Sequence, residues 1–295
     1  MTESTVPFVS VVIPTYRRPA ALDRCLASLA AQDYPHDRFE VIVVEDGGAE
    51  SAGGERAMEG MCVKWLRVPH GGPAAARNRG AAVARGAILL FIDDDCTADS
   101  RWLSTMAARV GACADAAIGG QVTNAVPDNR YARASQTLIT FLYRYYYEKN
   151  QGLLPFFTTN NLGVQAELFR RQRGFDASFA FASEDREWCD RLVQSGGRLV
   201  YAPDAIVHHA PSLSLAGFIR QHFRYGEGAW QFHRARGSRS GRAMEVEPVD
   251  FYAGMLRAPF AQGDPEPIRQ SVLLLASQAI AAIGYAIAAL RHSHR

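Results

Sequence analysis

Short apolar runs alternate with helical stretches along the first hundred residues. Runs of a few residues rich in valine, isoleucine and leucine are typical of strands, and they fall at 9–13, 40–44, 63–68 and 87–92. Between them, 19–31 and 73–85 have helical patterns, the first with Pro19 in its opening turn. Strands that alternate with helices need crossover connections, which predicts an α/β fold with a mostly parallel central sheet flanked by helices.

The second half of the chain is less regular. Helices are predicted at 131–148, 183–195 and 214–236. Strands are predicted at 198–201 and directly before His208. Polar, glycine-rich composition predicts a loop at 150–159 and a linker or loop at 237–250.

One long uncharged segment, 272–290, lies near the end and is followed by Arg291. Its length alone permits a membrane span. Its bulky residues recur every three or four positions, which predicts a helix with one apolar face. That stripe is Leu273, Ile280, Ile283, Ile287 and Leu290. The pattern favours packing against the protein or a dimer partner, with contact at a membrane surface and a true span as the alternatives.

Composition narrows the class of protein. The chain has 295 residues, 48% hydrophobic and 21% charged, which is ordinary for a soluble α/β protein. A formal net charge of +2 without a basic block predicts no nucleic-acid partner. The five cysteines form no CxxC pair, so neither a zinc site nor a disulfide framework is indicated. With no signal-peptide pattern at the first residues, MTESTVPF, we expect a cytoplasmic protein.

The sharpest chemical feature is a run of three aspartates, Asp93, Asp94 and Asp95, directly after the strand predicted at 87–92. Three adjacent carboxylates repel one another unless a cation or hydrogen-bond donors compensate them. Oxygen-rich sites suit Mg²⁺ or Mn²⁺. A solvated acidic turn is the alternative. The position at a strand end favours a ligand site, because open α/β sheets bind ligands there.

An ordered set of motifs gives this pattern a family resemblance. The chain resembles the inverting family 2 glycosyltransferases, which have a nucleotide-binding glycosyltransferase A fold, over roughly residues 8–230. The segments that carry the resemblance are VSVVIPTYRR at 9–18, VIVVEDGG at 41–48, ARNRGAAVARGAILLFIDDDC at 76–96, TTNNLGV at 158–164, GFD at 174–176, SEDREWCDRL at 183–192 and IVHH at 206–209.

The resemblance implies a site for the nucleotide. Pro14, Thr15, Tyr16 and Arg18 match the loop that lies against the base and ribose. Asp46 matches the acid that accepts a hydrogen bond from a pyrimidine ring. Since the imide N–H of uracil or thymine needs an acceptor, a UDP- or dTDP-linked donor is expected.

The same resemblance assigns the phosphate and metal positions. Arg77 and Asn78 match the element beside the base and phosphates. Asp93 matches the ribose-side carboxylate and Asp95 the metal ligand, with Asp94 between them. Simpler structural roles remain open for several of these residues: a helix cap for Asn78 (and for the threonine at 15) and a surface ion pair for Arg77.

A second acidic element, Glu184–Asp185, lies at the start of the helix predicted at 183–195, where the helix dipole favours an anion. The resemblance makes Asp185 the general base and Glu184 its neighbour. Capping together with Ser183 is the alternative. An acceptor hydroxyl must lose its proton as it attacks, and a positioned carboxylate contributes about 10²–10⁴-fold to such a step.

Three further positions follow from the resemblance. His209 is expected at the metal or diphosphate, while His208, on the opposite side of a strand, is expected to point away. Arg224, in QHFRY, is expected to pair with a phosphate or to lie on a helix surface. Asn161 is expected near the donor sugar.

These expectations define the predicted protein. Residues 1–120 form a nucleotide-sugar-binding half, 121–213 an acceptor and catalytic-base half of the same domain, and 214–295 a C-terminal helical region. The partners expected are a nucleotide-sugar donor, a carbohydrate, lipid-linked or small-molecule acceptor, and Mg²⁺ or Mn²⁺. Peripheral contact with the inner face of the membrane and a homodimer through the last helix are both compatible with the sequence.

Other functions are less well matched. A dinucleotide oxidoreductase lacks its glycine-rich turn, because PTYRRPAAL follows the first strand. A nucleotidyltransferase would use the same carboxylates and metal but would not need Asp185 as a base. A non-catalytic sugar-nucleotide binder would not need both acidic elements.

Overall fold

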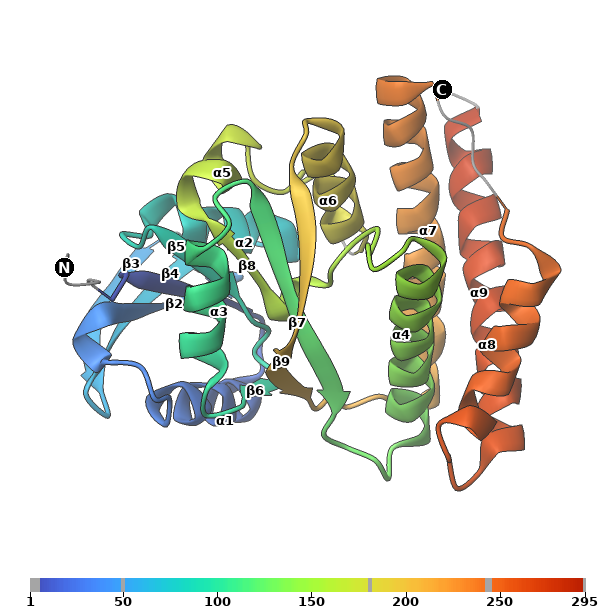
Figure 1. Ribbon diagram of the computed structural model, residues 1–295, viewed down its shortest axis with the longest axis horizontal. Helices are drawn as coiled ribbons and strands as arrows, with labels where there is room; N and C mark the ends of the chain where they lie inside the picture. Colours follow the sequence, from blue (N-terminus) through green and yellow to red (C-terminus); the bar gives the residue numbers. More distant parts are fainter. Residues whose placement is uncertain (1–5, 49–50, 180–181, 242–245, 294–295) are drawn as a thin grey trace. The chain divides into compact units, whose positions relative to one another are not determined.

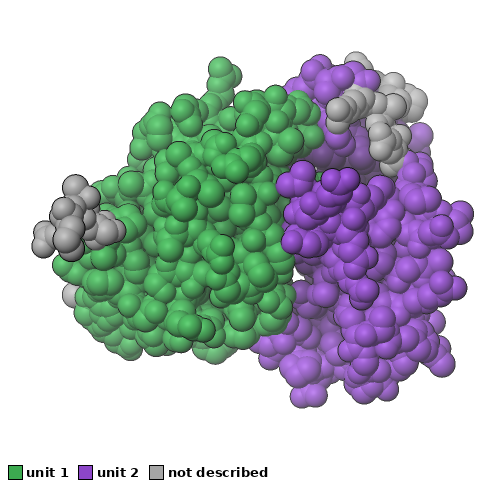
Figure 2. Space-filling model, viewed as in Figure 1, with its two compact units in different colours: residues 1–123, 155–180, 188–209 green, residues 124–154, 181–187, 210–295 purple. Residues whose placement is uncertain are grey.

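The computed structural model describes residues 6–48, 51–179, 182–241 and 246–293. The chain divides into two compact units, each built from several segments (Figure 2). Unit 1 comprises residues 1–123, 155–180 and 188–209, and unit 2 comprises 124–154, 181–187 and 210–295. This division differs from the three consecutive segments that we predicted, because the chain passes between the units five times.

Unit 1 is built on one sheet that has nine strands within the described residues (Figure 1). The strands are β1 (Val9–Thr15), β2 (Phe39–Asp46), β3 (Ser51–Met58), β4 (Met61–Val68), β5 (Ile88–Phe91), β6 (Cys96–Ala98), β7 (Ala116–Asn124), β8 (Leu162–Gln165) and β9 (Arg198–His209). Their order across the sheet is β3-β4-β2-β1-β5-β8-β7-β9-β6.

The sheet is mixed, and its parallel part is the part that the apolar runs predicted. Strands β4, β2, β1 and β5 are parallel neighbours, with Val9 opposite Phe39 on one side and Ile88 on the other. The pairings of β3 with β4, β8 with β5 and β7, and β6 with β9 are antiparallel. Since the carboxyl ends of parallel strands share one edge, the residues after β1, β2 and β5 come together.

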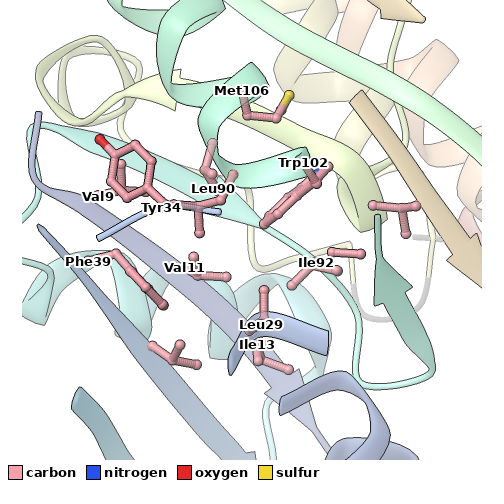
Figure 3. Packing of buried hydrophobic residues seen from close by; sticks show 14 of the residues in the cluster. Val9, Val11, Ile13, Leu29, Tyr34, Phe39, Leu90, Ile92, Trp102 and Met106 are labelled. Carbon is pink, nitrogen blue, oxygen red and sulfur yellow. The ribbon is translucent and has the colours of Figure 1, made fainter. Parts of the chain in front are cut away.

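Helices cover the sheet of unit 1. They are α1 (Pro19–Ala30), α2 (Gly72–Val83), α3 (Trp102–Gly111), α5 (Ala166–Arg171) and the part of α6 (Glu184–Gln194) that belongs to this unit, with the short 3₁₀ turns η1 (His36–Arg38) and η2 (Thr159–Asn161). Val11 of β1, Leu90 of β5 and Trp102 of α3 are fully buried in one apolar cluster (Figure 3). This core fixes the strands whose ends carry the aspartates.

Unit 2 is helical. It contains α4 (Arg130–Lys149), α7 (Leu215–Ser240), α8 (Val249–Ala261) and α9 (Pro267–Ser293). Phe141 of α4, Met255 of α8 and Leu274 of α9 meet in a separate apolar cluster. The segment 237–250, predicted as a linker, is partly helical: α7 continues to Ser240, ends at a left-handed Gly241, and α8 begins at Val249.

The last helix turns only part of its predicted apolar stripe toward the protein. The side that α9 buries consists largely of small or polar residues: Gln270, Leu274, Ser277, Gly284 and Ala288. Several bulky residues face outward, with Val272 60%, Leu275 57%, Ile283 55% and Leu290 63% exposed, whereas the stripe residues Leu273, Ile280 and Ile287 are half-buried. The close packing of α9 on α7 explains this, since a Cβ on Gly226 or Gly284 would lie within 2.2 Å of a main-chain oxygen of the other helix. In unit 2 the predicted stripe therefore does not pack inward as a whole.

Candidate active site

In unit 1, the aspartate run after β5 is contacted by Thr15 at the end of the parallel strand β1 and by the guanidinium of Arg18. The Thr15 hydroxyl, at the end of β1, donates to Asp94 at 2.8 Å. Arg18, just before α1, lies with Nη1 3.1 Å from Asp94 and 2.8 Å from Asp95. The helix-cap alternative for Thr15 is thus not what the structure shows. The run is a donor-compensated cluster in which Asp94 is buried and Asp93 and Asp95 are half-buried, and it is not a solvated acidic turn.

Burial and pairing shift the pKa values of Asp94 and Asp95 in opposite directions. Burial raises the pKa of Asp94, and the Thr15 hydroxyl and the Arg18 charge only partly offset it. Burial acts the same way on Asp95, but the hydrogen bond and charge of His209, with Arg18, outweigh it and lower the pKa. Asp95 is therefore the carboxylate of this pair that stays ionised most readily.

A buried arginine holds the first aspartate. Arg77, in α2, is 3% exposed and its Nη2 lies 2.5 Å from Asp93. A surface ion pair is excluded by this burial. Charge-assisted contacts of this kind fix a carboxylate's position, so Arg77 ties helix α2 to the end of β5.

The predicted base end of the site forms around Asp46, the last residue of β2. Its carboxylate accepts hydrogen bonds from the main-chain N–H groups of Gly71 and Gly72, at 2.8 and 3.0 Å, as α2 begins. His70 Nδ1 lies 3.0 Å from the same carboxylate and its ring stacks on Tyr16, with ring centroids 4.9 Å apart. A carboxylate has about four acceptor positions, so Asp46 retains capacity for one more donor.

His70 was missed by sequence reasoning. Its signal was the sequence HGG directly after the strand at 63–68, at the same edge of the sheet as Asp46. The ring is more than half exposed, so it offers a planar surface next to the exposed Tyr16. Together they provide an aromatic wall beside a carboxylate.

The loop after β1 is held in an uncommon backbone conformation. Arg17 has φ +55°, in the left-handed region that non-glycine residues rarely adopt, and its guanidinium lies 5.0 Å from the centre of the Tyr16 ring. Pro14 precedes it within β1, opposite Val44 of β2. Such strain persists where surrounding contacts fix the chain, and Arg18 supplies them through its ion pairs.

Pairing of the shortest strand places the predicted metal ligands together. Cys96 of β6 is opposite His209 of β9, which brings His209 Nε2 to 3.3 Å from Asp95 Oδ1. His208 instead contacts Thr123, with Nδ1 2.8 Å from the hydroxyl oxygen. The two histidines thus diverge, as alternation along a strand predicts.

The donor set fits a hard divalent cation. Possible ligand atoms of Asp95, Cys96 and His209 lie within 4.8 Å of one another. Burial raises the pKa of the Cys96 thiol well above its ordinary value, so that group stays protonated and is a poor ligand. A carboxylate and an imidazole remain, which suit Mn²⁺ or Mg²⁺ completed by substrate phosphates.

Two asparagines have structural contacts where ligand contacts were expected. Both amide hydrogens of Asn161 are used, by the carbonyls of Gln121 and Ala205 at 2.8 and 2.9 Å, and its oxygen accepts from Trp102 Nε1 at 2.8 Å. At 1% exposure it cannot offer a donor to a sugar. It joins three elements of unit 1 instead.

Asn78 is the second case. Its amide donates to the carbonyl of Phe175 at 2.7 Å and accepts from the N–H of the same residue at 2.9 Å. It lies within α2 and caps no helix end. Asn78 therefore anchors the GFD segment to α2, and its expected contact with the nucleotide stays a prediction.

Unit 2 holds the second acidic element. Glu184 is buried and Asp185 is half-buried, both in the first turn of α6, where the Asp185 carboxylate accepts the N–H of Arg186 at 2.7 Å. Their position at a helix start agrees with the sequence. Arg224 lies half-buried in the middle of α7, also in unit 2. Contact of Asp185 and Arg224 with the residues of unit 1 stays a prediction.

Comparisons with known proteins give the family of the chain. The family model described as glycosyl transferase family 2 matches residues 10–172. The glycosyltransferase AglE of Haloferax volcanii is 28% identical over 237 residues, 77% of this chain and 75% of that protein. The pre-mycofactocin glycosyltransferase of Mycobacterium tuberculosis is 29% identical over 232 residues, and the matched part is 46% of its length.

Solved structures give the fold. A mannosyltransferase of Pyrobaculum calidifontis, solved with GDP-Man and Mn²⁺, has a TM-score of 0.59 at 20% identity and covers 98% of this chain and 81% of its own. GalNAc-T7, solved with UDP, GalNAc and Mn²⁺, has a TM-score of 0.55 at 14% identity, covering 89% and 59%. At these identities the likeness establishes a glycosyltransferase A fold.

Proposed function

Because the chain belongs to glycosyl transferase family 2, we propose that it transfers a sugar, with inversion, from a nucleoside-diphosphate donor to an acceptor hydroxyl. The observation that carries the proposal is the compensated cluster of Asp93, Asp94 and Asp95 at the strand edge. Carboxylates, two arginines and a histidine gathered there match the needs of a diphosphate and its cation.

The nucleotide end is assigned to unit 1. Tyr16 and His70 supply a planar surface for the base, and Asp46 supplies an acceptor for a ring N–H. Asp93, which forms an ion pair with Arg77, is proposed to accept hydrogen bonds from the ribose hydroxyls. This arrangement supports UDP or dTDP, whose imide N–H meets a carboxylate.

Asp95 and His209 would hold Mg²⁺ or Mn²⁺ with the donor's phosphates. Both neighbours named above were solved with Mn²⁺, which supports a divalent metal here. When bound, the cation neutralises the negative charge that grows on the leaving diphosphate. Arg18, which contacts Asp94 and Asp95, adds a second positive charge at the same edge.

Asp185 is proposed as the general base, with Glu184 beside it. The acceptor hydroxyl gives its proton to the Asp185 carboxylate as its oxygen bonds to the anomeric carbon, and the bond from that carbon to the diphosphate oxygen breaks on the opposite face. A single displacement inverts the anomeric configuration, whereas retention by double displacement would require a carboxylate nucleophile.

The acceptor is proposed to be a carbohydrate, a lipid-linked molecule or a small molecule with a free hydroxyl. A soluble or peripheral protein on the cytoplasmic side agrees with the fold and composition. Among the described residues one helix, Pro267–His292, is long and apolar enough to cross a membrane, with a mean hydropathy of 2.0 and 22% of its most apolar window buried. We propose that its outward apolar face contacts the membrane surface, with a homodimer as the alternative.

A donor panel tests the reaction. Purified protein with Mn²⁺ or Mg²⁺ is incubated with UDP-, dTDP- and GDP-sugars, with and without a lysate as the source of acceptors, and nucleoside diphosphate is measured. Release of nucleoside diphosphate from at least one donor is expected. Release of pyrophosphate from nucleoside triphosphate and sugar phosphate would indicate a nucleotidyltransferase instead, and no turnover with any donor would contradict the proposal.

A further inference from the structure

The proposed base lies directly after a backbone conformation that needs external support. Ser183, the residue before α6, has φ +73°, in the left-handed region. A serine there is disfavoured by steric contact of its Cβ with the main chain. Such a conformation persists only where neighbouring groups fix it. The groups that do so in unit 2 belong to α7.

Helix α7 contacts the chain immediately before the base. A Cβ built on Gly228 would lie 2.7 Å from the carbonyl oxygen of Ala182 and 2.8 Å from the hydroxyl of Ser183. Only a glycine lets the helix approach the main chain this closely. Helix α7 therefore packs directly against Ala182 and Ser183, at the left-handed turn.

The same helix contacts the chain immediately after the base. The Arg186 guanidinium lies 5.4 Å from the centre of the Phe232 ring. The carboxylate of Glu187, whose side chain is 3% exposed, forms an ion pair with Arg239 at 2.6 Å. A buried carboxylate in such a pair is held firmly, since removing its partner would leave an uncompensated charge.

These contacts share one face of α7. Gly228, Phe232 and Arg239 follow at intervals of four and seven residues, which place them along a single side of a helix. They contact residues 182–183, 186 and 187, on both sides of Asp185. We propose that this face of α7 is a positioning clamp for Asp185, with the Glu187–Arg239 ion pair as its far end.

The clamp rests on the proposed function, in which Asp185 takes the acceptor's proton. A base is effective only within hydrogen-bond reach of that proton, and a misplacement of about 1 Å can cost about 100-fold in rate. The donor's base, ribose and metal are assigned to residues of unit 1, and Arg224, the expected phosphate contact, is not a member of the clamp. Loosening the clamp therefore affects kcat for transfer and leaves the KM for the donor unchanged.

The test compares four variants with the wild-type protein, measuring kcat, donor KM and thermal unfolding for each. Arg239→Gln is expected to lower kcat about 10- to 100-fold with donor KM within about twofold of wild type. Arg239→Lys keeps the charge and should recover most of kcat. Glu187→Gln leaves no buried carboxylate without a partner, so it provides a folded variant even if Arg239→Gln unfolds, and it should also lower kcat.

Arg291→Gln is the matched control. It breaks another arginine ion pair of α7, with Glu227 at 3.1 Å, which joins α7 to α9 and not to α6, and should keep wild-type kcat. Wild-type kcat in folded Arg239→Gln and Glu187→Gln would overturn the clamp while leaving the proposed function intact. Absence of transfer by the wild-type protein, with any donor, would overturn the proposed function and the clamp with it.

Discussion

Substitution of Asp185 should impair the transfer reaction and leave donor binding unchanged. Asp185→Asn keeps size and hydrogen-bonding capacity but cannot take a proton. We expect transfer to fall by about 10²–10⁴-fold, while donor affinity stays within about twofold of wild type. Calorimetric titration of the nucleotide and a product assay measure the two quantities. Asp190→Asn, on the same helix beyond its first turn, is the control, and equal loss of binding and transfer in Asp185→Asn would contradict its assignment as the base.

Substitution of Asp95 should weaken metal-dependent binding of the nucleotide while the protein stays folded. Its carboxylate lies next to His209 and Arg18, so Asp95→Ala removes the anionic ligand of the proposed cation. We expect the nucleoside diphosphate to bind at least tenfold more weakly with Mn²⁺ present and about equally without it. Asp115→Ala, which breaks an exposed ion pair with Arg198, is the control. An unchanged metal effect in Asp95→Ala would exclude Asp95 as a ligand.

His222 makes unit 2 sensitive to acid. Its ring, 2% exposed, lies against Phe218 and Tyr225, and burial lowers its pKa to about 4 from an ordinary 6.5. Between pH 6.5 and pH 4, His222 binds a proton in the unfolded chain but not in the folded state. The stability that the neutral ring contributes is therefore present above pH 6.5 and is lost as the pH falls to 4. The loss attributable to this group is about 3 kcal/mol.

The measurement is urea unfolding as a function of pH for wild type and His222→Leu. The leucine variant should lose less stability than wild type between pH 6.5 and 4. Parallel pH profiles for the two proteins would show that His222 does not titrate in this range.

At the same scale, the sequence predicted charged residues better than amides. The need of Asp93, Asp94 and Asp95 for compensation could be predicted because adjacent charges at a strand end repel one another, and the structure pairs them with arginines. Asn78 and Asn161 could not, because an amide serves a main-chain contact as well as a ligand contact. His70 was missed because its role depends on Tyr16 from the loop after β1, a contact that no local pattern records.

At the scale of elements, buried parallel strands and long helices were predictable and antiparallel additions were not. Strands β1, β2, β4 and β5 carry dense apolar runs, whereas β6 has three residues and gains its place only by pairing with β9. The two short strands predicted at 198–201 and before residue 208 are one strand, β9, because Pro203 does not interrupt it. Helix α3 was missed although it buries Trp102.

Helix α9 shows why its orientation could not be read from periodicity. A stripe of large residues usually faces the core, but here the glycines that let α7 and α9 approach closely turn small residues inward. From Ile268 to Leu290 the outward face is predominantly apolar. Exposed apolar faces of this length mark contact with a partner or a membrane.

The outward face gives a prediction for lipid binding. The protein should float with vesicles of phosphatidylcholine and phosphatidylglycerol, and Leu275→Glu with Ile283→Glu should abolish flotation, since each leucine or isoleucine transfer contributes about 1.5–3 kcal/mol. Leu153→Glu, at an exposed leucine outside α9, is the control. If the wild type did not float but formed a dimer that the double substitution dissociates, this face would instead be assigned to contact with a second copy of the chain.

At the scale of the whole molecule, the proposed functions divide between the two units. The residues assigned to the base, the ribose and the metal belong to unit 1. Those assigned to the acceptor's proton belong to unit 2, as does Arg224, the phosphate contact expected from the sequence. We could not predict this division from the sequence, where we expected the consecutive segments 1–120, 121–213 and 214–295. The first turn of α6 belongs to unit 2 with the other helices, whereas the rest of α6 belongs to unit 1 with the sheet. The division predicts that nucleotide binding and base chemistry can be removed separately.

Ligand-linked stability tests that separation. A ligand at 100 times its Kd raises stability by about 2.7 kcal/mol, enough to shift thermal unfolding by a few degrees. UDP or dTDP with Mn²⁺ should raise the unfolding temperature more than GDP, since Asp46 accepts one imide N–H, and a chelator should abolish the shift. Asp185→Asn and Arg239→Gln should keep the full nucleotide shift, whereas Asp46→Ala and Asp95→Ala should lose most of it. If the unit 2 variants lost the shift as fully as the unit 1 variants, the nucleotide would depend on both units and the proposed division would be wrong.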